Sequence, residues 1–460
     1  MLLRLKRGTT TIILSGDGGV ILGCTYTPRT PDVDEQEVRT ILRSGGEITA
    51  MARRNVTESA SVVLAGPASA ILNMVRQLEA LLPVESVDRR GKSVYVEYRA
   101  EGTGDVYRSE VLAGRVEWPD RPLDPWLASG VAEVLVIWTR RYYWEDTTLR
   151  DVPLSNGNGS GVTTGLTIYN HNDGGAGHDN FVDIDGADVT GVIPAPARIL
   201  LANTSGVDYS LRNIYIGHNV QSAPGTFNAI LEGEASTAGG TTVADSGSSN
   251  GSYRSLTWSG PLNNIFGFQW PLGSTRLAQA RGHYFRVLAR LAGLSGTVFA
   301  RLSLRYPADL PLTAIAESMA EIQLRSGALL QDLGVIQIPP FNLSQPVDLA
   351  LVVILRSPGS GSLLLDFVQL TALDSWRHLY QLGYLTEATD TVVDDGIENV
   401  AYVQEADGDQ VPIYASYGQP IHLWPGRDQR LTFLWDEANN MNITRTFAVQ
   451  VQYRPRRLTV

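Results

Sequence analysis

The sequence is poor in residue types that several protein functions require. Cys24 is the only cysteine among the 460 residues, so neither an intramolecular disulfide nor a cysteine zinc cluster can form. Lys6 and Lys92 are the only lysines, which leaves 35 arginines among the 37 basic residues. The 48 acidic residues outnumber them and give a formal net charge of −11. This balance argues against a nucleic-acid-binding protein with a broad basic face.

Long hydrophobic runs are missing as well. No window approaches the ~18 consecutive apolar residues of a membrane-spanning helix, so we expect no membrane insertion. The opening stretch MLLRLKRGTTTIIL has too short an apolar core for a signal peptide, so we expect synthesis in the cytoplasm.

Motifs of catalysis are not found either. The sequence has no Gly-x-Ser-x-Gly in a strand-to-helix context and no His-Glu-x-x-His. The glycine-rich stretch SGDGGVILG lies between two strand-like runs, and no Gly-Lys-Ser or Gly-Lys-Thr follows, so we expect no phosphate-binding loop. We therefore expect that the chain is not an enzyme and that it carries no cofactor, apart from a structural calcium ion considered below.

The residues that are abundant indicate a mainly β protein. Apolar residues make up 43% of the chain, which is enough for several buried cores. Short runs rich in Val, Ile, Leu and Tyr alternate with Gly, Pro, Asn and Ser turns, as in LRNIYIGHN, HYFRVLARLAG and LALVVILRS. This pattern predicts antiparallel sheets, including a jelly-roll-like sandwich.

The same pattern suggests a division into domains. Residues 1–154 are predicted to form a β domain with one helix at about 68–82, where PASAILNMVRQLEALLP places apolar residues at helical spacing between two prolines. Residues 155–165 are rich in Gly, Ser and Asn and predict a linker. Residues 166–374 are predicted to form the sandwich. Residues 375–460 form a C-terminal β segment that could complete the first domain.

Two apolar runs between residues 347 and 373 are predicted to form a hairpin. The stretch VDLALVVILRSPGSGSLLLDFVQLTAL contains a Pro-Gly-Ser-Gly turn between them. Asp366 interrupts the apolar face of the second strand. It is either a solvated residue at a sheet edge or a residue that faces a ligand.

Acidic residues gather near 180. Asp-x-Asp-Gly turns supply hard oxygen ligands, so a structural calcium site is one interpretation of this cluster. Asx-rich turns without metal are the alternative, and His171 with His178 leaves a transition-metal site as a third. The calcium candidates are Asp179, Asp183, Asp185 and Asp188.

Aromatic and arginine side chains gather at the end of one predicted strand. Trp, Tyr and Arg are enriched at the energetic centres of interfaces. A subunit contact and a strand covered on both faces within its own domain both explain the cluster. On the first explanation, replacing Trp144 by Ala impairs assembly more than folding. The candidates are Trp138, Arg140, Arg141, Tyr142, Tyr143 and Trp144.

Further aromatic residues lie in the predicted sandwich. Such rings either fill the core or stack on sugars, which have an apolar C–H face and a polar rim. These residues are Tyr209, Tyr215, Tyr253, Trp258, Trp270 and Tyr284.

The chain resembles the tail-tip proteins of long-tailed bacteriophages, of the distal tail or minor tail class. The stretches that carry the resemblance are ASVVLAGPASAILNMVRQLEALLP, GRVEWPDRPLDPWLASGVAEVLVIWTRRYYWED and PGRDQRLTFLWDEANNMNITRTFAVQVQYRPRR. LRNIYIGHNV, HYFRVLARLAG and LLLDFVQLTAL are similar to strands of a jelly-roll carbohydrate-binding module.

The resemblance implies a structural virion protein. It implies a tail-tube-like first domain, assembly of copies into a ring of six or three in the baseplate, and contacts with other tail proteins. The sandwich would then bind a host-surface glycan or serve as decoration, and the protein would be made in the host cytoplasm. A free-standing carbohydrate-binding or adhesion protein is the alternative, and a hydrolase on a β scaffold is a third.

Overall fold

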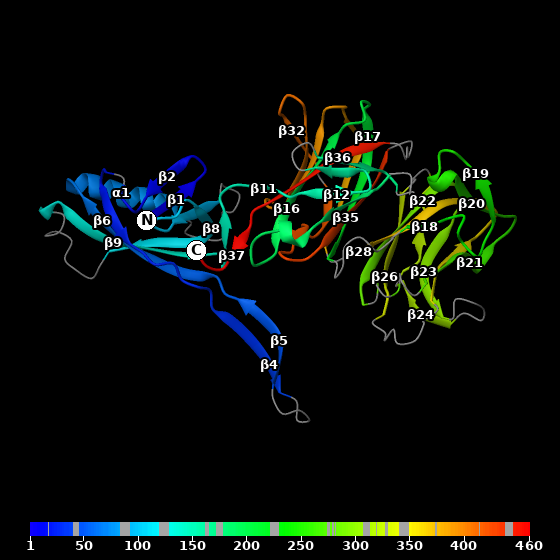
Figure 1. Cartoon of the computed structure of the whole chain (residues 1–460), viewed down its shortest axis with the longest axis horizontal. Coiled ribbons are helices and arrows are strands. Elements are labelled where there is room, and N and C mark those ends of the chain that lie inside the picture. Colours follow the sequence, from blue (N-terminus) through cyan, green and yellow to red (C-terminus); the bar gives the residue numbers. More distant parts are fainter. Residues whose placement is uncertain are drawn as a thin grey trace. The chain divides into compact units, whose positions relative to one another are not determined.

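The computed structural model divides the chain into two compact units (Figure 1). Unit 1 comprises Met1–Arg150, Thr190–Pro194 and Arg454–Val460, and unit 2 comprises Asp151–Val189 and Ala195–Tyr453. The structure describes residues 1–16, 18–39, 46–82, 93–118, 128–161, 165–171, 178–220, 230–273, 277, 280, 282–306, 313–318, 320–326, 330–339, 349–372, 375–413, 415–437 and 445–460.

Unit 1 is built on a nine-stranded antiparallel sheet with the main order β2-β1-β7-β8-β9-β6-β3. Strands β2 and β3 follow each other in sequence yet occupy the two edges of this main order. Its strands are β1 (Leu2–Arg7), β2 (Thr10–Ile13), β3 (Ile21–Thr25), β6 (Val56–Ala65), β7 (Val94–Arg99), β8 (Tyr107–Glu117), β9 (Val131–Arg140), β10 (Trp144–Asp146) and β37 (Arg456–Arg457).

The predicted helix is confirmed. Helix α1 (Ala68–Leu81) follows Pro67, whose fixed φ suits a helix start. Its apolar stripe, Ile71, Val75, Leu78 and Leu81, is buried in the core of unit 1. Within the described part of the chain, no helix is both long enough and apolar enough to cross a membrane.

A two-stranded ribbon extends from unit 1. Strands β4 (Val33–Arg39) and β5 (Gly46–Arg53) pair antiparallel along their whole length. Figure 1 shows the ribbon running away from the nine-stranded sheet. Among the described residues, no further strand pairs with either of them. A ribbon of two strands has too few neighbours to be stable by itself in water.

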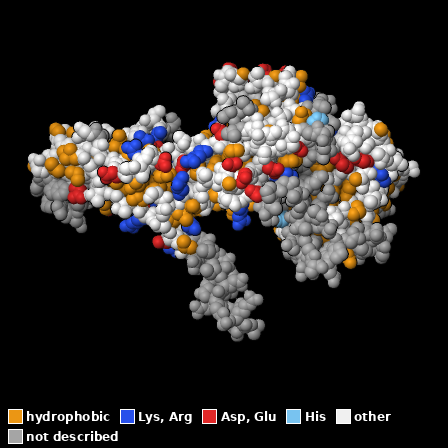
Figure 2. All heavy atoms as spheres, in the orientation of Figure 1, with side chains coloured by type: hydrophobic (Ala, Val, Ile, Leu, Met, Phe, Trp, Pro, Cys, Tyr) orange, Lys and Arg blue, Asp and Glu red, His pale blue; other side chains and the backbone are white. Residues whose placement is uncertain are grey.

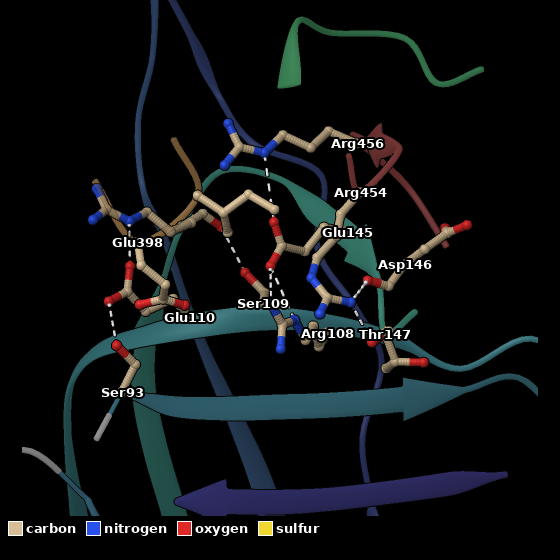
Figure 3. A network of polar contacts seen from close by, with 12 residues as sticks. Ser93, Arg108, Ser109, Glu110, Glu145, Asp146, Thr147, Glu398, Arg454 and Arg456 are labelled. Carbon is tan, nitrogen blue, oxygen red and sulfur yellow. Dashed lines mark hydrogen bonds and ion pairs between the residues drawn. The ribbon is translucent and has the colours of Figure 1, made fainter. Parts of the chain in front are cut away.

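The end of the chain belongs to unit 1. Strand β37 pairs with β10 and places Arg456 opposite Glu145. The buried Glu145 carboxylate accepts a hydrogen bond of 2.9 Å from Arg108 Nε and lies 3.6 Å from Arg456 Nε (Figure 3). Two guanidinium groups therefore neutralise one buried carboxylate and fasten the last strand to the sheet.

Ion pairs between neighbouring strands are frequent in unit 1. Arg4 pairs with Glu97 across β1 and β7 at 2.5 Å, and Arg141 pairs with Glu110 at 2.8 Å. Figure 2 shows basic and acidic side chains interspersed over the visible face of this unit. Because the two signs alternate, the surface of unit 1 carries no extended field of one sign on that face.

Unit 2 contains a first sandwich whose two sheets enclose an apolar core. Strand β11 (Arg150–Asp151) lies at the junction of the units in sequence. One sheet contains β36 (Thr446–Tyr453), β16 (Ala195–Asn203), β30 (Thr391–Asp395), β31 (Val400–Gln404), β32 (Gln410–Pro412), β14 (Leu166–Tyr169) and β34 (His422–Leu423). The other contains β13 (Gly159–Gly161), β12 (Leu154–Asn156), β15 (Phe181–Ile184), β35 (Gln429–Glu437), β17 (Tyr209–Val220), β29 (Ser375–Thr386) and β33 (Ala415–Gly418).

A second sandwich lies between β17 and β29 in sequence and has a core of its own. One sheet contains β19 (Thr241–Ala244), β20 (Ser252–Trp258), β28 (Gly361–Ala372), β22 (Tyr284–Ser295), β26 (Leu330–Gln337) and β18 (Ile230–Glu232). The other contains β21 (Leu262–Pro271), β27 (Ala350–Ser357), β23 (Phe299–Tyr306), β24 (Thr313–Glu317) and β25 (Ile322–Gln323).

The mainly β prediction is confirmed, and the arrangement of domains differs in detail from the expected one. Residues 166–374, expected as a single sandwich, contain strands of two. Residues 375–460 pair mainly with β16 and β17, and only Arg454–Val460 belongs to unit 1. Residues 155–165, expected as a linker, include the paired strands β12 and β13. Pairing between segments far apart in sequence leaves no local pattern, which explains these differences.

The expected hairpin between residues 347 and 373 is wrong. Strands β27 and β28 follow each other, but β27 pairs with β21 and β23 while β28 pairs with β18, β20 and β22. The Pro-Gly-Ser turn at 358–360 therefore leads from one sheet of the second sandwich to the other. Successive residues Ala350–Leu355 are all buried, so both faces of β27 are covered, as in a central strand.

Replacing Trp144 by Ala should destabilise unit 1. The indole is fully buried, and the Arg140 guanidinium lies 4.3 Å from its ring centre. We expect a loss of about 3–5 kcal/mol in the free energy of unfolding. Leu72→Ala removes a partly exposed side chain from α1 and should change it by less than about 0.5 kcal/mol. Calorimetry of both variants checks this, and equal transitions would contradict it.

Candidate functional site

Three of the six predicted interface residues are buried inside unit 1. Trp138, Arg140 and Trp144 have no exposed surface. Alternation along β6 directs Glu58 toward the core, and Arg140 Nη2 and Nε meet its two carboxylate oxygens at 2.8 and 3.0 Å. Tyr26 also donates a hydrogen bond of 2.7 Å to this carboxylate. The burial of Trp144 reverses the expectation that its truncation affects assembly more than folding.

The other three predicted interface residues keep part of their surface. Arg141, Tyr142 and Tyr143 are half-buried. Arg141 Nε donates to Glu110 at 2.8 Å, and the two tyrosine rings meet edge to face. Their role in a subunit contact stays a prediction.

The calcium candidates do not form a metal-binding group in the described residues. Within those residues, no three His, Cys, Asp or Glu side chains are placed to hold one ion. Both oxygens of Asp183 are engaged by Arg430 at 2.7 Å. Asp185 accepts a hydrogen bond from Ala187 N at the start of the 3₁₀ turn that contains Asp188, as an Asx turn does. Calcium binding that includes Asp179 stays a prediction.

Asp366 is neither a solvated edge residue nor exposed to a ligand. Its side chain is fully buried and pairs with Arg290 Nη1 at 2.6 Å, while Ser249 N donates to it at 2.9 Å. Burial raises the pKa of this carboxyl to about 7. Burial also raises the pKa of the nearby Glu232 to about 8. This is a closed polar cluster inside the second sandwich.

A cavity of about 500 Å³ lies in unit 2 where strands of both sandwiches meet. Its size is in the range of small-molecule sites. The wall combines tyrosine rings with amide, guanidinium and carboxylate groups. The lining residues are Arg212, Asn213, Tyr215, Ile322, Gln323, Arg325, Leu330, Gln331, Asp332, His378, Tyr380 and Tyr417.

The lining residues from the first sandwich lie together because of the register of its strands. In the pairing of β17 with β29, Tyr215 lies opposite His378 and Asn213 opposite Tyr380. In the pairing of β29 with β33, His378 lies opposite Tyr417. Because side chains two residues apart share one face of a strand, these residues form a continuous patch on one face of the sheet.

His378 is the centre of this patch. Its ring stacks on Tyr215 with centroids 4.1 Å apart and an interplanar angle of 8°, and its Nε2 hydrogen-bonds Asn213 Oδ1 at 2.8 Å. Burial lowers the pKa of His378 to about 4. The ring is therefore neutral near pH 7 and serves as a packing and hydrogen-bonding group.

The acidic lining residue Asp332 and the neighbouring Asp436 both have partners. Asp332 pairs with Arg286, whose guanidinium also lies 3.8 Å from the ring centre of Trp376. Asp436 accepts a hydrogen bond of 2.8 Å from Asn213 Nδ2, and burial raises the pKa of Asp436 to about 6.

Sequence reasoning identified one residue of this cavity and missed the rest. Tyr215 was among the candidate sugar platforms, while Tyr209, Trp258 and Trp270 are buried in cores. The stretch WRHLY carries rings at three alternating positions, Trp376, His378 and Tyr380, which is the signal that could have pointed to the patch. The partners from β25 and β26 leave no such signal.

Comparisons with known proteins give structural neighbours only. No family model and no curated protein matches the sequence. The Dit protein of phage SPP1, a hub adsorption protein of phages that infect Gram-positive hosts, has a TM-score of 0.33 and 8% identity over 99% of both chains. Two structures of the phage p2 baseplate in its activated conformation also match. The one with Sr has a TM-score of 0.28 and 8% identity over 77% of this chain and 98% of that one. The one with Ca has a TM-score of 0.27 and 9% identity over 78% of this chain and 99% of that one.

These neighbours are hub and baseplate proteins of phages, and at such scores no function is carried over from them.

His378→Phe should flatten the pH dependence of stability. The folded state resists protonation of His378 between about pH 6.5 and pH 4, whereas the unfolded chain is protonated there. The native protein therefore loses stability as pH falls through this window, by up to about 1.4 kcal/mol per pH unit. Phenylalanine keeps the ring and removes the titration, while Asp332 and Asp436 remain in both proteins. Urea denaturation across this range checks the slopes, and identical slopes would refute the expectation.

Proposed function

We propose that this chain is a structural subunit of a phage tail tip, in which unit 1 assembles copies into a ring and the cavity of unit 2 binds a host-surface glycan. The resemblance of the sequence to distal tail proteins supports the first part. The β4–β5 ribbon is the single structural observation that carries it.

The ribbon favours a neighbouring copy as its partner. Its two strands satisfy only each other's backbone groups within the described chain, and Val33, the first residue of the ribbon, is exposed. An isolated ribbon gains too little burial to offset the entropy cost of ordering it. In a ring each copy receives the ribbon of the next one, so a repeated contact stabilises every ribbon.

The cavity has the composition expected of a glycan site. Tyr380 and Tyr417 offer flat apolar faces, and the Tyr417 side chain is 55% exposed. The exposed Gln323 supplies an amide donor and acceptor beside the rings. Sugars present apolar C–H faces and polar rims, so one wall of this kind contacts both.

Removing the ribbon should abolish assembly and leave the subunit folded. Arg54 N donates a hydrogen bond of 3.2 Å to Asp32 O, so the two ends of the ribbon are adjacent. A two-glycine turn can therefore replace residues 33–53. We expect the full chain to form a closed oligomer of three or six 50.0 kDa subunits and the shortened chain to be a monomer.

Size-exclusion chromatography with light scattering measures both masses, and circular dichroism confirms that the shortened chain is folded. A full-length chain that stays monomeric at high concentration would exclude the ring. A shortened chain that assembles like the full one would exclude the ribbon as the contact.

Tyr417→Ala should weaken glycan binding. Loss of one stacking ring costs roughly 0.5–1.5 kcal/mol, which is up to about tenfold in affinity. Tyr306→Ala is the matched control, because that residue is 48% exposed and does not line the cavity. Glycan-array screening followed by calorimetry on the best ligand measures both. Equal losses in the two variants would place the glycan elsewhere.

A free-standing carbohydrate-binding protein remains the second candidate, and the cavity is the observation that favours it. This candidate would be favoured if the full-length chain is a monomer, binds glycan, and binds it more weakly after Tyr417→Ala.

A further inference from the structure

We infer that the cavity of unit 2 recognises an anionic glycan, one that carries carboxylate or phosphate groups. The inference rests on the proposed glycan binding and names the chemical class of its ligand. It depends on two arginines, Arg212 and Arg325, that line the cavity from the two sandwiches of unit 2.

Arg212 reaches the cavity because of a β-bulge. The register of β17 skips Arg212 in its pairing both with β29 and with β35. Leu211 and Ile214 are both in the core of the first sandwich. The two residues between them, Arg212 and Asn213, therefore both face the cavity, which regular alternation would not allow. Bulges of this kind redirect side chains and recur beside binding sites.

Arg325 is presented by a fixed stretch of backbone. The buried side chain of Gln331 accepts a hydrogen bond from Arg325 N and donates one to Arg325 O, both at 3.1 Å. These two bonds hold the backbone of Arg325 as a neighbouring strand would. The guanidinium itself extends into solvent at the cavity. A fixed backbone lowers the entropy cost of binding through this side chain.

Neither guanidinium has an acidic partner at salt-bridge distance among the described residues. Of the carboxylates nearby, Asp332 pairs with Arg286, while Asp436 is hydrogen-bonded to Asn213 and lies within electrostatic range of Arg212, which acts to lower its pKa against the effect of burial. Among the lining residues, two guanidinium groups, Arg212 and Arg325, face one carboxylate, Asp332, which is paired with Arg286, and His378 is neutral. The cavity is thus locally positive in a chain of net charge −11.

This arrangement selects ligand chemistry. A guanidinium binds carboxylate and phosphate oxygens through paired N–H donors, and such charge-assisted hydrogen bonds are stronger than those to neutral hydroxyls. Tyr417 and Gln323 would contact the sugar rings and hydroxyls of the same ligand. A neutral glycan would leave both arginines without a partner, so it would bind more weakly.

Calorimetry on the full-length protein with three probes of equal length tests the inference. The probes are an oligogalacturonide, an oligomer of glycerol phosphate and a neutral galacto-oligosaccharide. We expect one or both anionic probes to bind at least about tenfold more tightly than the neutral one, with affinity falling as salt rises. Whether the carboxylated or the phosphorylated probe binds identifies the source of the anion.

Arg212→Gln and Arg325→Gln should each reduce binding of the anionic probe by about tenfold, and the double variant should abolish the preference over the neutral probe. Arg427→Gln is the matched control, because it removes one exposed guanidinium of unit 2 outside the cavity. The thermal transitions of all variants should match that of the native protein, since Arg325 and Arg427 are exposed and the half-buried Arg212 makes no salt bridge with a described residue.

Anionic probes that bind no better than the neutral one, or that bind the double variant as well as the native protein, would overturn the inference. Neutral binding that depends on Tyr417 but not on the arginines would leave the proposed glycan function standing. If no probe binds and no glycan on the array binds either, both the anionic preference and the proposed glycan binding are excluded.

Discussion

The pairing of β17 with β29 is the constraint on which unit 2 depends. It places Tyr215 beside His378 and so joins the two ends of the second sandwich within a sheet of the first. The entropy cost of closing so long a loop grows only slowly with its length, so a whole sandwich can be inserted at this point. The outer face of the same pair carries the rings that line the cavity. The same β17–β29 pairing therefore holds the second sandwich in the first and positions the side chains of the cavity.

Buried arginine ion pairs are the second recurring feature, and they give the arginine-rich composition a physical use. Arg140 with Glu58, Arg290 with Asp366, and Arg377 with Asp394 are all buried pairs. A planar guanidinium meets both oxygens of a carboxylate, which a lysine ammonium cannot do. Because burial of either charge alone is costly, each pair fixes the alignment of the strands that carry it. At the cavity, Arg212 and Arg325 form no such salt bridge with a described carboxylate. Their availability is what indicates an anionic ligand there.

Local patterns predicted some elements well. Helical spacing between two prolines gave the helix at 68–81, and alternating apolar runs gave the mainly β class. The same patterns did not reveal that strands at 347–373 separate into two sheets, or that Asp366 is buried. Both depend on partners that approach from distant parts of the chain. The aromatic cluster at 138–144 was recognised, but its composition suits a buried network as well as an interface, and for Trp138, Arg140 and Trp144 the structure shows the former.

The sequence by itself determined the absence of disulfides and cysteine metal clusters, the acidic charge, the strand-rich character and the position of the helix, because these follow from composition and short-range periodicity. Only the tertiary structure decided the nesting of one sandwich in another, the isolation of the β4–β5 ribbon and the cavity with its two arginines. Antiparallel pairing is specified by the fit of whole faces across long sequence separations. A bulge at one residue, Arg212, can then redirect a side chain without leaving a mark in the local pattern.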